Sequence, residues 1–406
     1  MTTTQAIPPV LGRVPMRDLM TAPYPTLAAI RESTPAFAVE NNGYRMWVIT
    51  RYEDVRQVLS DPSVRRDLVA HRKEINSHCL VRVQQRAHLP HGSRRSFFDR
   101  DGDEHRRLRG LVGSIFSPGR LVALRADTER ITAELLDKLP VGEPVDLLDR
   151  FARPLAGTVI CDLVGVPVDE RNMLAVLETE MITSPVITEI EEAAQRLHDF
   201  SVELVALKRE RPRDDLFTAL LHRHDEGRMS LDELTSTYVL LLVGGMEPAS
   251  AIGNGVFTLL TNPDQTARLL ADPSLFAGCV DEIVRYESPF RFVPPRYTTA
   301  PIELDGVTIP AGELLLISLA AANRDPARFP EPDSFDPDRD TKGHLGFGYG
   351  VHRCLGAELG RIETATALRA LFERFPRTRL TVPPDDAVWR PGKFMRRLDT
   401  LPVILN

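Results

Sequence analysis

Apolar residues recur at spacings of three and four through most of the segment from about Asp103 to Asn262, and this period predicts a series of amphipathic helices. Another strong helical pattern begins near Leu355 and stops before Pro376. One clear run of such apolar positions comprises Leu121, Leu124, Ile131, Leu135 and Leu139. The hydrophobic pattern therefore predicts a mainly α fold.

Patterns typical of strands are few and short. Residues 44–50 form an apolar run, and a helical pattern starts directly after it near Tyr52. Beyond residue 285 the chain turns to Pro-rich loops and short alternating segments. Within residues 302–309, Asp305 and Gly306 form a dipeptide typical of a tight hairpin turn. These segments predict a small β region beside the helices.

The helix predicted for residues 231–260 has unusually clear boundaries. Ser230 and Glu233 have the spacing of a capping box, and Pro263 ends the pattern. At 1.5 Å per residue this helix would be on the order of 45 Å long. Residues 238–243 are apolar on all sides, so we expect this helix to run through the core.

Composition excludes several classes of protein. The 406 residues carry 50 Lys and Arg against 57 Asp and Glu, a formal charge of −7, and aromatic residues make up 6%. A nucleic-acid binder would show an excess of basic residues, so we do not expect this protein to bind nucleic acid. The four cysteines are scattered, which suits a reducing compartment. We find no secretory signal, membrane span, repeat or linker, and we expect one cytoplasmic domain over residues 1–406 without membrane attachment.

The segment most informative about chemistry is residues 347–356, Phe-Gly-Tyr-Gly-Val-His-Arg-Cys-Leu-Gly. Three glycines in ten residues are costly to order, which indicates that something approaches this backbone closely. Cys354 lies where the loop enters a helix, and the positive end of the helix dipole favours a thiolate, which is a metal ligand. The alternative is that Cys354 is a small buried apolar residue. A zinc site is disfavoured because no second ligand stands at the required spacing.

This pattern, Phe-Gly-x-Gly-x-His-x-Cys-x-Gly, resembles the haem-binding signature of the cytochrome P-450 family. The resemblance implies haem b with Cys354 as the iron ligand and with Phe347, Gly348, His352 and Gly356 at the cofactor. It extends over essentially the whole chain and indicates the soluble bacterial type. It also implies a triangular, mainly α fold, with the haem between the central helix and the helix that follows the cysteine.

Three further basic residues are expected at the haem on the same resemblance. His105 and Arg109 are four apart on a predicted helix and therefore share a face. A solvated basic surface is the alternative for this pair. In the family, such a pair contacts the haem propionates, and Arg296 and His352 occupy the places of further propionate contacts.

Glu282 and Arg285 are three apart on a predicted helix, where they can form an ion pair. A solvated surface pair is the commoner outcome for this spacing. The resemblance instead implies a buried network that Arg339 completes. We therefore assign a structural role to these three residues.

The chain departs from the family in its central helix. The family carries an acid followed by a threonine there, whereas Gly244, Gly245 and Met246 are followed here by Glu247 and Pro248. We expect Pro248 to kink the helix, because it has no amide hydrogen to donate to the carbonyl of Gly244.

Without the threonine hydroxyl, proton delivery needs another source. The candidates are water held by Glu247, the hydroxyl of Ser250, or a polar group of the substrate. Ser250 ranks last because it lies two residues from Pro248 and so points to another face. Our hypothesis is that the substrate assists. Gly244, Gly245, Glu247 and Pro248 are the candidate catalytic segment.

The family's substrate-contact regions correspond here to residues 64–98, 181–187, 243–247, 290–293 and 394–395. Ordinary core packing is the alternative for any one of these side chains. The first region is rich in arginine and histidine, which is consistent with a solvated face or with recognition of an acidic substrate or a carrier protein that bears it. The side chains expected to line the pocket are Val243, Met246, Phe290, Val293 and Met395.

We therefore predict a haem-thiolate monooxygenase, an oxidoreductase acting on paired donors that oxidises a small intermediate of secondary-metabolite or antibiotic biosynthesis. The alternatives are oxidative coupling or cyclisation, peroxide-dependent oxidation, and ligand binding without turnover. The implied partners are a ferredoxin-type electron donor with its reductase, which would dock near Arg353 and Arg361. We expect a monomer.

Overall fold

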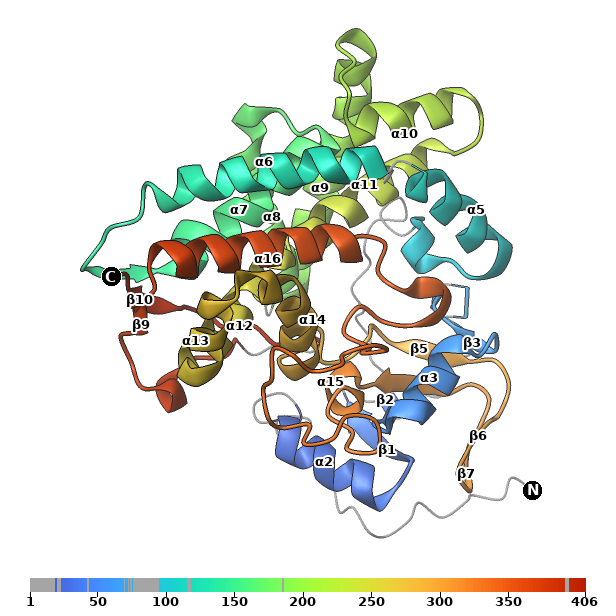
Figure 1. Cartoon of the computed structure of the whole chain (residues 1–406). Coiled ribbons are helices and arrows are strands. Elements are labelled where there is room, and N and C mark those ends of the chain that lie inside the picture. The colour runs from blue at the N-terminus through green and yellow to red at the C-terminus, as the bar shows by residue number, and fades with distance from the viewer. Residues whose placement is uncertain are drawn as a thin grey trace. The chain divides into compact units, whose positions relative to one another are not determined.

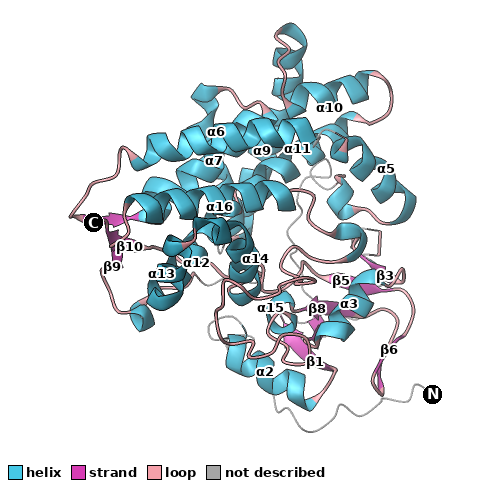
Figure 2. Cartoon of the chain, in the orientation of Figure 1, coloured by secondary structure: helices cyan, strands magenta, loops and turns pink. Residues whose placement is uncertain are grey.

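The computed structural model describes residues 19, 23–41, 44–68, 70–71, 73, 75, 95–114, 118–184, 186–390 and 394–406. The chain forms two compact units that exchange segments along the sequence. The first, here called the sheet unit, comprises Met1–Gln84, Asp281–Cys354 and Trp389–Arg397. The second, the helical unit, comprises Gln85–Val280, Leu355–Val388 and Leu398–Asn406. Helix predominates over strand in the described residues, which confirms the mainly α prediction (Figure 2).

The sheet unit is built around a five-stranded sheet in the order β1-β2-β8-β5-β3. Its strands are β1 (Ala36–Asn41), β2 (Tyr44–Ile49), β3 (Val64–Arg65), β5 (Arg296–Thr298) and β8 (Leu314–Ile317). Its short helices are α2 (Pro23–Ser33), α3 (Tyr52–Ser60), α15 (Leu319–Ala322) and the 3-10 turn η6 (Gly350–His352). Most of α14 (Phe276–Tyr286) also lies in this unit.

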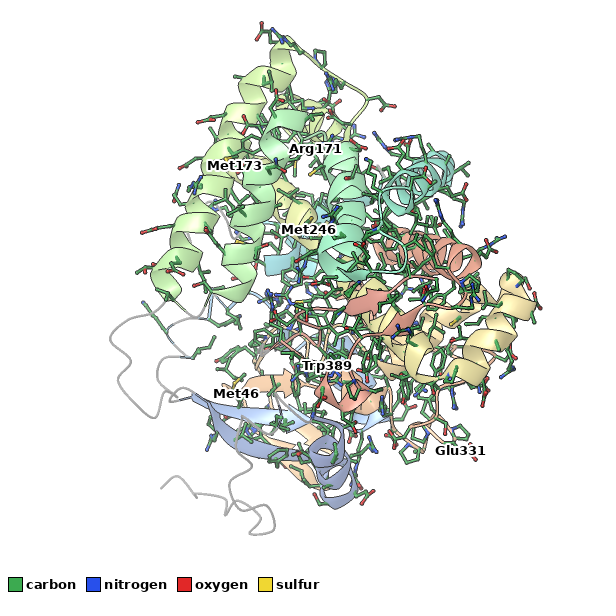
Figure 3. The ribbon with its side chains drawn as sticks, turned by 90° about the vertical axis from the view of Figure 1, so that its left-hand side faces the viewer. Met46, Arg171, Met173, Met246, Glu331 and Trp389 are labelled. Carbon is green, nitrogen blue, oxygen red and sulfur yellow. The ribbon has the colours of Figure 1, made fainter. Side chains whose placement is uncertain are left out.

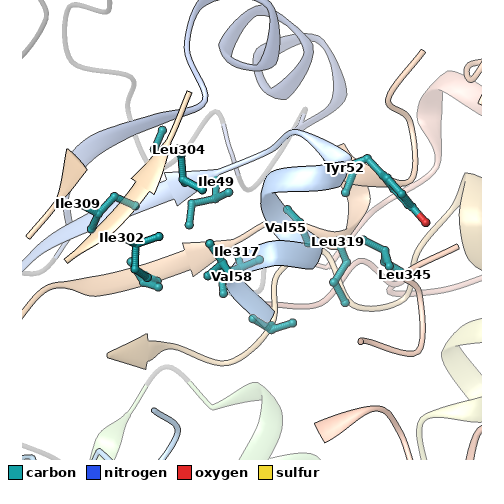
Figure 4. Packing of buried hydrophobic residues seen from close by; sticks show 14 of the residues in the cluster. Ile49, Tyr52, Val55, Val58, Ile302, Leu304, Ile309, Ile317, Leu319 and Leu345 are labelled. Atoms are coloured by element: carbon teal, nitrogen blue, oxygen red, sulfur yellow. The ribbon is translucent and has the colours of Figure 1, made fainter. Parts of the chain in front are cut away.

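Strands β2 and β8 contribute to a core on each face of the sheet, which explains why β8 is apolar throughout. Strand β2 pairs in parallel with β8, with Ile49 opposite Ile317. Those two side chains belong to one core cluster, together with residues of α3 (Figure 4). Their chain neighbours Val48 and Leu316 belong to a second cluster with α2. Successive side chains of these strands point to opposite faces of the sheet, and each face packs in its own hydrophobic cluster.

A separate two-stranded hairpin pairs β6 (Ile302–Leu304) with β7 (Val307–Ile309). Asp305 and Gly306 form its turn with φ values of 40° and 82°. Positive φ at both central positions defines the tight turn that matches the twist of the flanking strands. The hairpin predicted from the sequence is confirmed.

The helical unit contains most of the described helices, including the longest ones (Figure 1). They are α5 (Gly102–Gly113), α6 (Pro118–Leu136), α7 (Arg153–Val164), α8 (Arg171–Thr183), α9 (Ile187–Glu210), α10 (Leu216–Asp225), α11 (Leu231–Gly245), α12 (Pro248–Thr261), α13 (Pro263–Ala271) and α16 (Ala357–Arg374). The shorter helical segments are η2 (Phe97–Asp99), η3 (Leu148–Ala152), η4 (Val168–Glu170), η5 (Pro273–Leu275) and η7 (Pro384–Asp386). A small sheet in the order β4-β10-β9 joins β4 (Pro144–Asp146), β10 (Pro402–Ile404) and β9 (Arg379–Leu380).

The predicted central helix exists and is divided into α11 and α12. The capping box is present, because Glu233 N–H donates to Ser230 Oγ at 3.2 Å and Ser230 N–H donates to Glu233 Oε2 at 2.7 Å. Residues 231–261 are long and apolar enough to cross a membrane by length and composition alone. Buried positions such as Tyr238 and Leu242 are also those expected of a core helix.

Helix α16 packs against α6 and α12 within the helical unit and carries a buried acid. Glu363 is fully buried, and neither carboxylate oxygen has a hydrogen-bond partner among the described residues. Burial raises the pKa of Glu363 well above its usual value and so favours the neutral acid in the folded protein.

A protonated Glu363 makes stability depend on pH in a definite direction. The unfolded chain releases this proton above its ordinary pKa, so the stabilisation is full below that value and is lost as pH rises towards the raised pKa of the folded state. Relative to Glu363→Gln, the wild-type free energy of unfolding should fall with rising pH by at most about 1.4 kcal/mol per unit. Urea unfolding between pH 5 and pH 8 measures this difference. The same substitution at half-exposed Glu373 of α16 is the control, and an equal slope in both variants would contradict the assignment.

Candidate active site

The loop that leads to Cys354 is held by its own backbone. Gly348 N–H donates to the carbonyl of Leu345 at 2.7 Å, and Cys354 N–H donates to the carbonyl of Phe347 at 2.8 Å. Gly348 and Gly350 adopt φ values of 73° and 70°, in the left-handed region that favours glycine. Cys354 is exposed at the end of this loop, whereas Cys161 and Cys279 are buried.

Close packing adds a second reason for glycine in this loop. A Cβ at Gly350 would lie 2.6 Å from the carbonyl oxygen of Leu59 in α3. A Cβ at Gly346 would lie 3.0 Å from the carbonyl oxygen of Val284 in α14. The loop therefore presses its backbone against two helices of the sheet unit, which fixes where Cys354 is presented.

A buried ion-pair network lies behind the loop. Arg285 donates through Nε to Glu282 Oε2 at 2.6 Å and through Nη2 to Oε1 at 2.8 Å, and both side chains are fully buried. Arg339 Nε reaches Glu282 Oε1 at 3.2 Å. The surface-pair alternative is wrong for this geometry. Because a buried charge without a partner is costly, removing one member should destabilise the network strongly.

Hydrogen bonds connect this network to the cysteine loop. Arg285 Nη1 donates to the carbonyl of Asn323 at 2.9 Å, and the side-chain Oδ1 of Asn323 accepts from Leu345 N–H at 2.6 Å. The carbonyl of Leu345 in turn accepts from Gly348. The side chain and carbonyl of Asn323 therefore connect the buried salt bridge to the cysteine loop.

The basic residues expected at the haem are divided between the two units. Arg296 lies in β5 with an exposed fraction of 6%, and His352 lies in η6, both in the sheet unit. His105 and Arg109 lie in α5 of the helical unit. Phe97 adjoins both, with the His105 ring 6.4 Å from its centroid and the Arg109 guanidinium 5.9 Å away. His105 is buried, unlike a residue of a solvated basic face.

The central helix is distorted where Pro248 enters it. Glu247 N–H donates to the carbonyl of Gly244 at 3.4 Å, and Ser250 N–H donates to the carbonyl of Glu247 at 2.9 Å. These bonds span three residues instead of four, as in a tightened turn. The predicted interruption at Pro248 is therefore present, and it separates α11 from α12.

The Ser250 hydroxyl lies closer to Glu247 than the sequence suggested. Ser250 Oγ donates to Glu247 Oε2 at 3.4 Å, and Ser250 is buried. Spacing from Pro248 ranked this hydroxyl last, but its spacing of three from Glu247 puts the two side chains on one face.

Helix α7 packs closely against the same segment. A Cβ at Gly245 would overlap the side chain of Ile160. A Cβ at Gly157 would lie 3.4 Å from the Met246 methyl carbon, so the absence of a side chain at Gly157 leaves room for Met246 (Figure 3). The expectation that Met246 and half-buried Val243 line the pocket stays a prediction.

The remaining pocket candidates lie in the sheet unit. Phe290 and Met395 face each other in an isolated antiparallel bridge, and both are half-buried. Val293 belongs to the core cluster of this unit, as the core-packing alternative describes. Residues 76–94, which hold part of the basic segment, lie outside the described residues.

Sequence reasoning did not single out Phe97 or Arg291. Phe97 lies a few residues before the helix that carries His105, and this nearness in sequence could have marked it as a neighbour of that side chain. Arg291 interrupts the apolar run 290–293, and its complete burial could not be inferred from that pattern.

The chemistry of the donor set fits a haem. Among the described residues, no group of three or more His, Cys, Asp or Glu side chains could hold a metal ion. Cys354 offers a single sulfur ligand, which suits a metal whose other ligands come from a macrocycle. Arg296, His352, His105 and Arg109 are suitable donors for carboxylates.

Comparison with known proteins defines the class. The family model described as Cytochrome P450 matches residues 169–396. Cytochrome P450 107B1 of Saccharopolyspora erythraea is 42% identical over 364 residues, covering 89% of this chain and 90% of the relative. The chain belongs to the cytochrome P450 family, and it is a haem-dependent monooxygenase of the bacterial type.

Two further relatives support this assignment. The 6-deoxyerythronolide B hydroxylase of the same organism is 40% identical over 394 residues, covering 94% of this chain and 96% of the relative. The structure of the tirandamycin C-bound P450 monooxygenase TamI has a TM-score of 0.88 and 34% identity, covering 97% of this chain and all (100%) of that one. The predicted fold, haem cofactor and enzyme class are confirmed, and ligand binding without turnover is set aside.

The two glycines of the central helix should respond differently to a methyl group. Gly245→Ala places a Cβ against Ile160, and overpacking of this kind costs about 1–3 kcal/mol. Gly244→Ala meets no described atom within 4 Å, so it should not lower stability. Urea unfolding followed by circular dichroism compares the two variants. Equal destabilisation of both would contradict the packing described here.

Proposed function

We propose that Cys354 is the axial iron ligand and that the enzyme oxidises a polyketide-type intermediate of natural-product biosynthesis. The observation that carries the first part is the exposed Cys354 at the end of a loop fixed by two left-handed glycines. The second part is supported by the relatives, one named for 6-deoxyerythronolide B and one bound to tirandamycin C.

The other residues of the cofactor site follow from the same proposal. His105, Arg109, Arg296 and His352 pair with the two propionates. Each is a cationic or neutral donor, and two carboxylates in a mostly apolar site need such partners. Phe347, Gly348 and Gly356 border the porphyrin. When bound, haem b would supply the activation of dioxygen, and a thiolate from Cys354 would favour cleavage of the O–O bond.

Protons reach the reaction through Glu247 in this proposal. Pro248 has no hydroxyl, so the group that holds a proton beside Glu247 is Ser250 Oγ, supported by their separation of 3.4 Å. A polar group on the substrate completes the path. The segment Gly244–Pro248 is then the catalytic segment, in which Gly244 leaves open space and Gly245 permits the approach of α7.

Oxidative coupling is the second candidate reaction. We consider it because Pro248 stands where the family carries the threonine whose hydroxyl assists oxygen insertion. A neighbour of similar fold, the P450 enzyme CxnD for C–S bond formation, has a TM-score of 0.86 and 30% identity. Labelled dioxygen distinguishes the two reactions, because only insertion leaves label in the product.

The proposal also covers the protein partners and the cellular location of the enzyme. A ferredoxin-type protein and its reductase supply electrons, docking near exposed Arg353 and near Arg361. A carrier protein presents the substrate, as supported by the structure of P450BioI with an acyl carrier protein, which has 29% identity. The enzyme is a cytoplasmic monomer, and residues 1–406 act as one catalytic domain.

Replacing the sulfur of Cys354 tests the ligand assignment. The carbon-monoxide complex of the ferrous wild-type protein should show the red-shifted Soret band of thiolate ligation, and Cys354→Ser should abolish that shift because a serine oxygen donates less electron density. Cys161→Ser, at a buried cysteine, is the control and should retain the shift. A wild-type spectrum without the shift would refute the assignment.

Ser250→Ala tests proton delivery. General acid catalysis contributes on the order of 100-fold or more, so we expect product formed per reductant consumed to fall by at least about tenfold. Ser250→Thr keeps the hydroxyl and should retain most of the coupling. If coupling is unchanged in Ser250→Ala but falls for a substrate analogue without polar groups, the substrate alone delivers the proton.

A further inference from the structure

Two of the proposed pocket segments are joined within the sheet unit by backbone hydrogen bonds. Arg291 N–H donates to the carbonyl of Phe394 at 2.7 Å, and Arg396 N–H donates to the carbonyl of Pro289 at 2.8 Å. Between these bonds, Phe290 faces Met395. The turn of residues 394–396 therefore takes its position from the segment of residues 289–291.

The side chain of Arg291 reinforces this junction. Its Nη2 donates to the carbonyl of Met395 at 2.6 Å, and its Nη1 donates to the carbonyl of Leu19 at 3.2 Å. The guanidinium is fully buried and is among the largest side chains so enclosed. A planar fork with two fixed donors sets both distance and direction, which a lysine ammonium does not.

Stability alone is a weak reason for an arginine at this position. Burial, and secondly the charge of Arg396, lower the pKa of Arg291 to about 10. Well-packed apolar residues often replace buried charges at no loss of stability. Because Arg291 donates to the backbone carbonyl of Met395, its function is better explained as positioning of the turn.

A second arginine holds the turn from its other side. Arg396 Nε donates to Glu287 Oε2 at 2.5 Å, and its guanidinium lies 3.6 Å from the centroid of the Trp389 ring, which Figure 3 labels. Tyr24 also donates to Glu287, at 3.1 Å. Two buried arginines thus bracket Met395, one bonded to its carbonyl and the other next to it in sequence.

We propose that Arg291 is a positioning residue that sets ligand selectivity by fixing Met395 against Phe290. This inference rests on the proposed function, in which those two side chains line the substrate pocket. Arg291 contacts no substrate. It determines how far the turn of residues 394–396 extends, and hence how much room a ligand substituent finds beside Met395.

The test uses two probes that bind ferric haem directly, imidazole and 4-phenylimidazole, titrated spectroscopically into the holoenzyme. The phenyl group needs the pocket, and imidazole alone does not. Arg291→Lys should change the ratio of the two dissociation constants by at least about fivefold, within the range of coupling between contacting residues. Arg396→Lys should move the ratio in the same direction and serves if Arg291→Lys does not fold.

A double-mutant cycle with Met395→Ala separates positioning from general loosening. If Arg291 acts through Met395, Arg291→Lys should change the ratio by less than about twofold once Met395 is alanine. Arg31→Lys is the matched control. Arg31 is a largely enclosed arginine of the same unit that bonds the carbonyl of Ala321 and pairs with Asp325, and its replacement should leave the ratio unchanged.

Each outcome decides one claim. If the ratio of dissociation constants is unchanged in both Arg291→Lys and Arg396→Lys, the positioning role is overturned. It is also overturned if the double variant changes the ratio by the product of the changes caused by Arg291→Lys and Met395→Ala alone. Wild-type protein without an imidazole-induced spectral change would instead refute the haem site. Arg291→Lys that retains the thiolate Soret band while the ratio changes supports the inference.

Discussion

The ion pair between Glu282 and Arg285 is the interaction on which the active-site loop depends. Both charges are completely buried, so the pair is stable only because their remaining donors and acceptors are satisfied. Arg285 satisfies them by bonding the carbonyl of Asn323, and Asn323 in turn holds Leu345 at the start of the cysteine loop. A charge that cannot be left unpaired thereby fixes the backbone that presents Cys354.

Close backbone approach is the second constraint, and it operates in both units. Gly350 lets the cysteine loop reach the end of α3, and Gly245 lets the central helix meet Ile160 of α7. Neither glycine is needed for flexibility. Each removes a side chain where a neighbour occupies the space, and the neighbour is determined by tertiary packing.

Buried arginines shape the sheet unit more than ion pairs on its surface do. Arg285 bonds a carboxylate, whereas Arg291 bonds backbone carbonyls of segments far away in sequence. An arginine with a fixed fork can hold two segments at a set separation. In this way segments near both ends of the chain are held at the side chain of Arg291.

The sequence by itself determined the helices, the hairpin at Asp305 and Gly306, the interruption at Pro248 and the family, because each depends on local period, turn chemistry or a short motif. Only the tertiary structure decided that Ser250 approaches Glu247 and that Arg291 bonds Met395, and it established the burial of Glu282 that the family resemblance implied. Burial and partner choice depend on which segments meet, and one spacing along a chain is compatible with many such meetings. For the same reason, Glu363 carries no sign in the sequence of α16 that it is enclosed as a neutral acid.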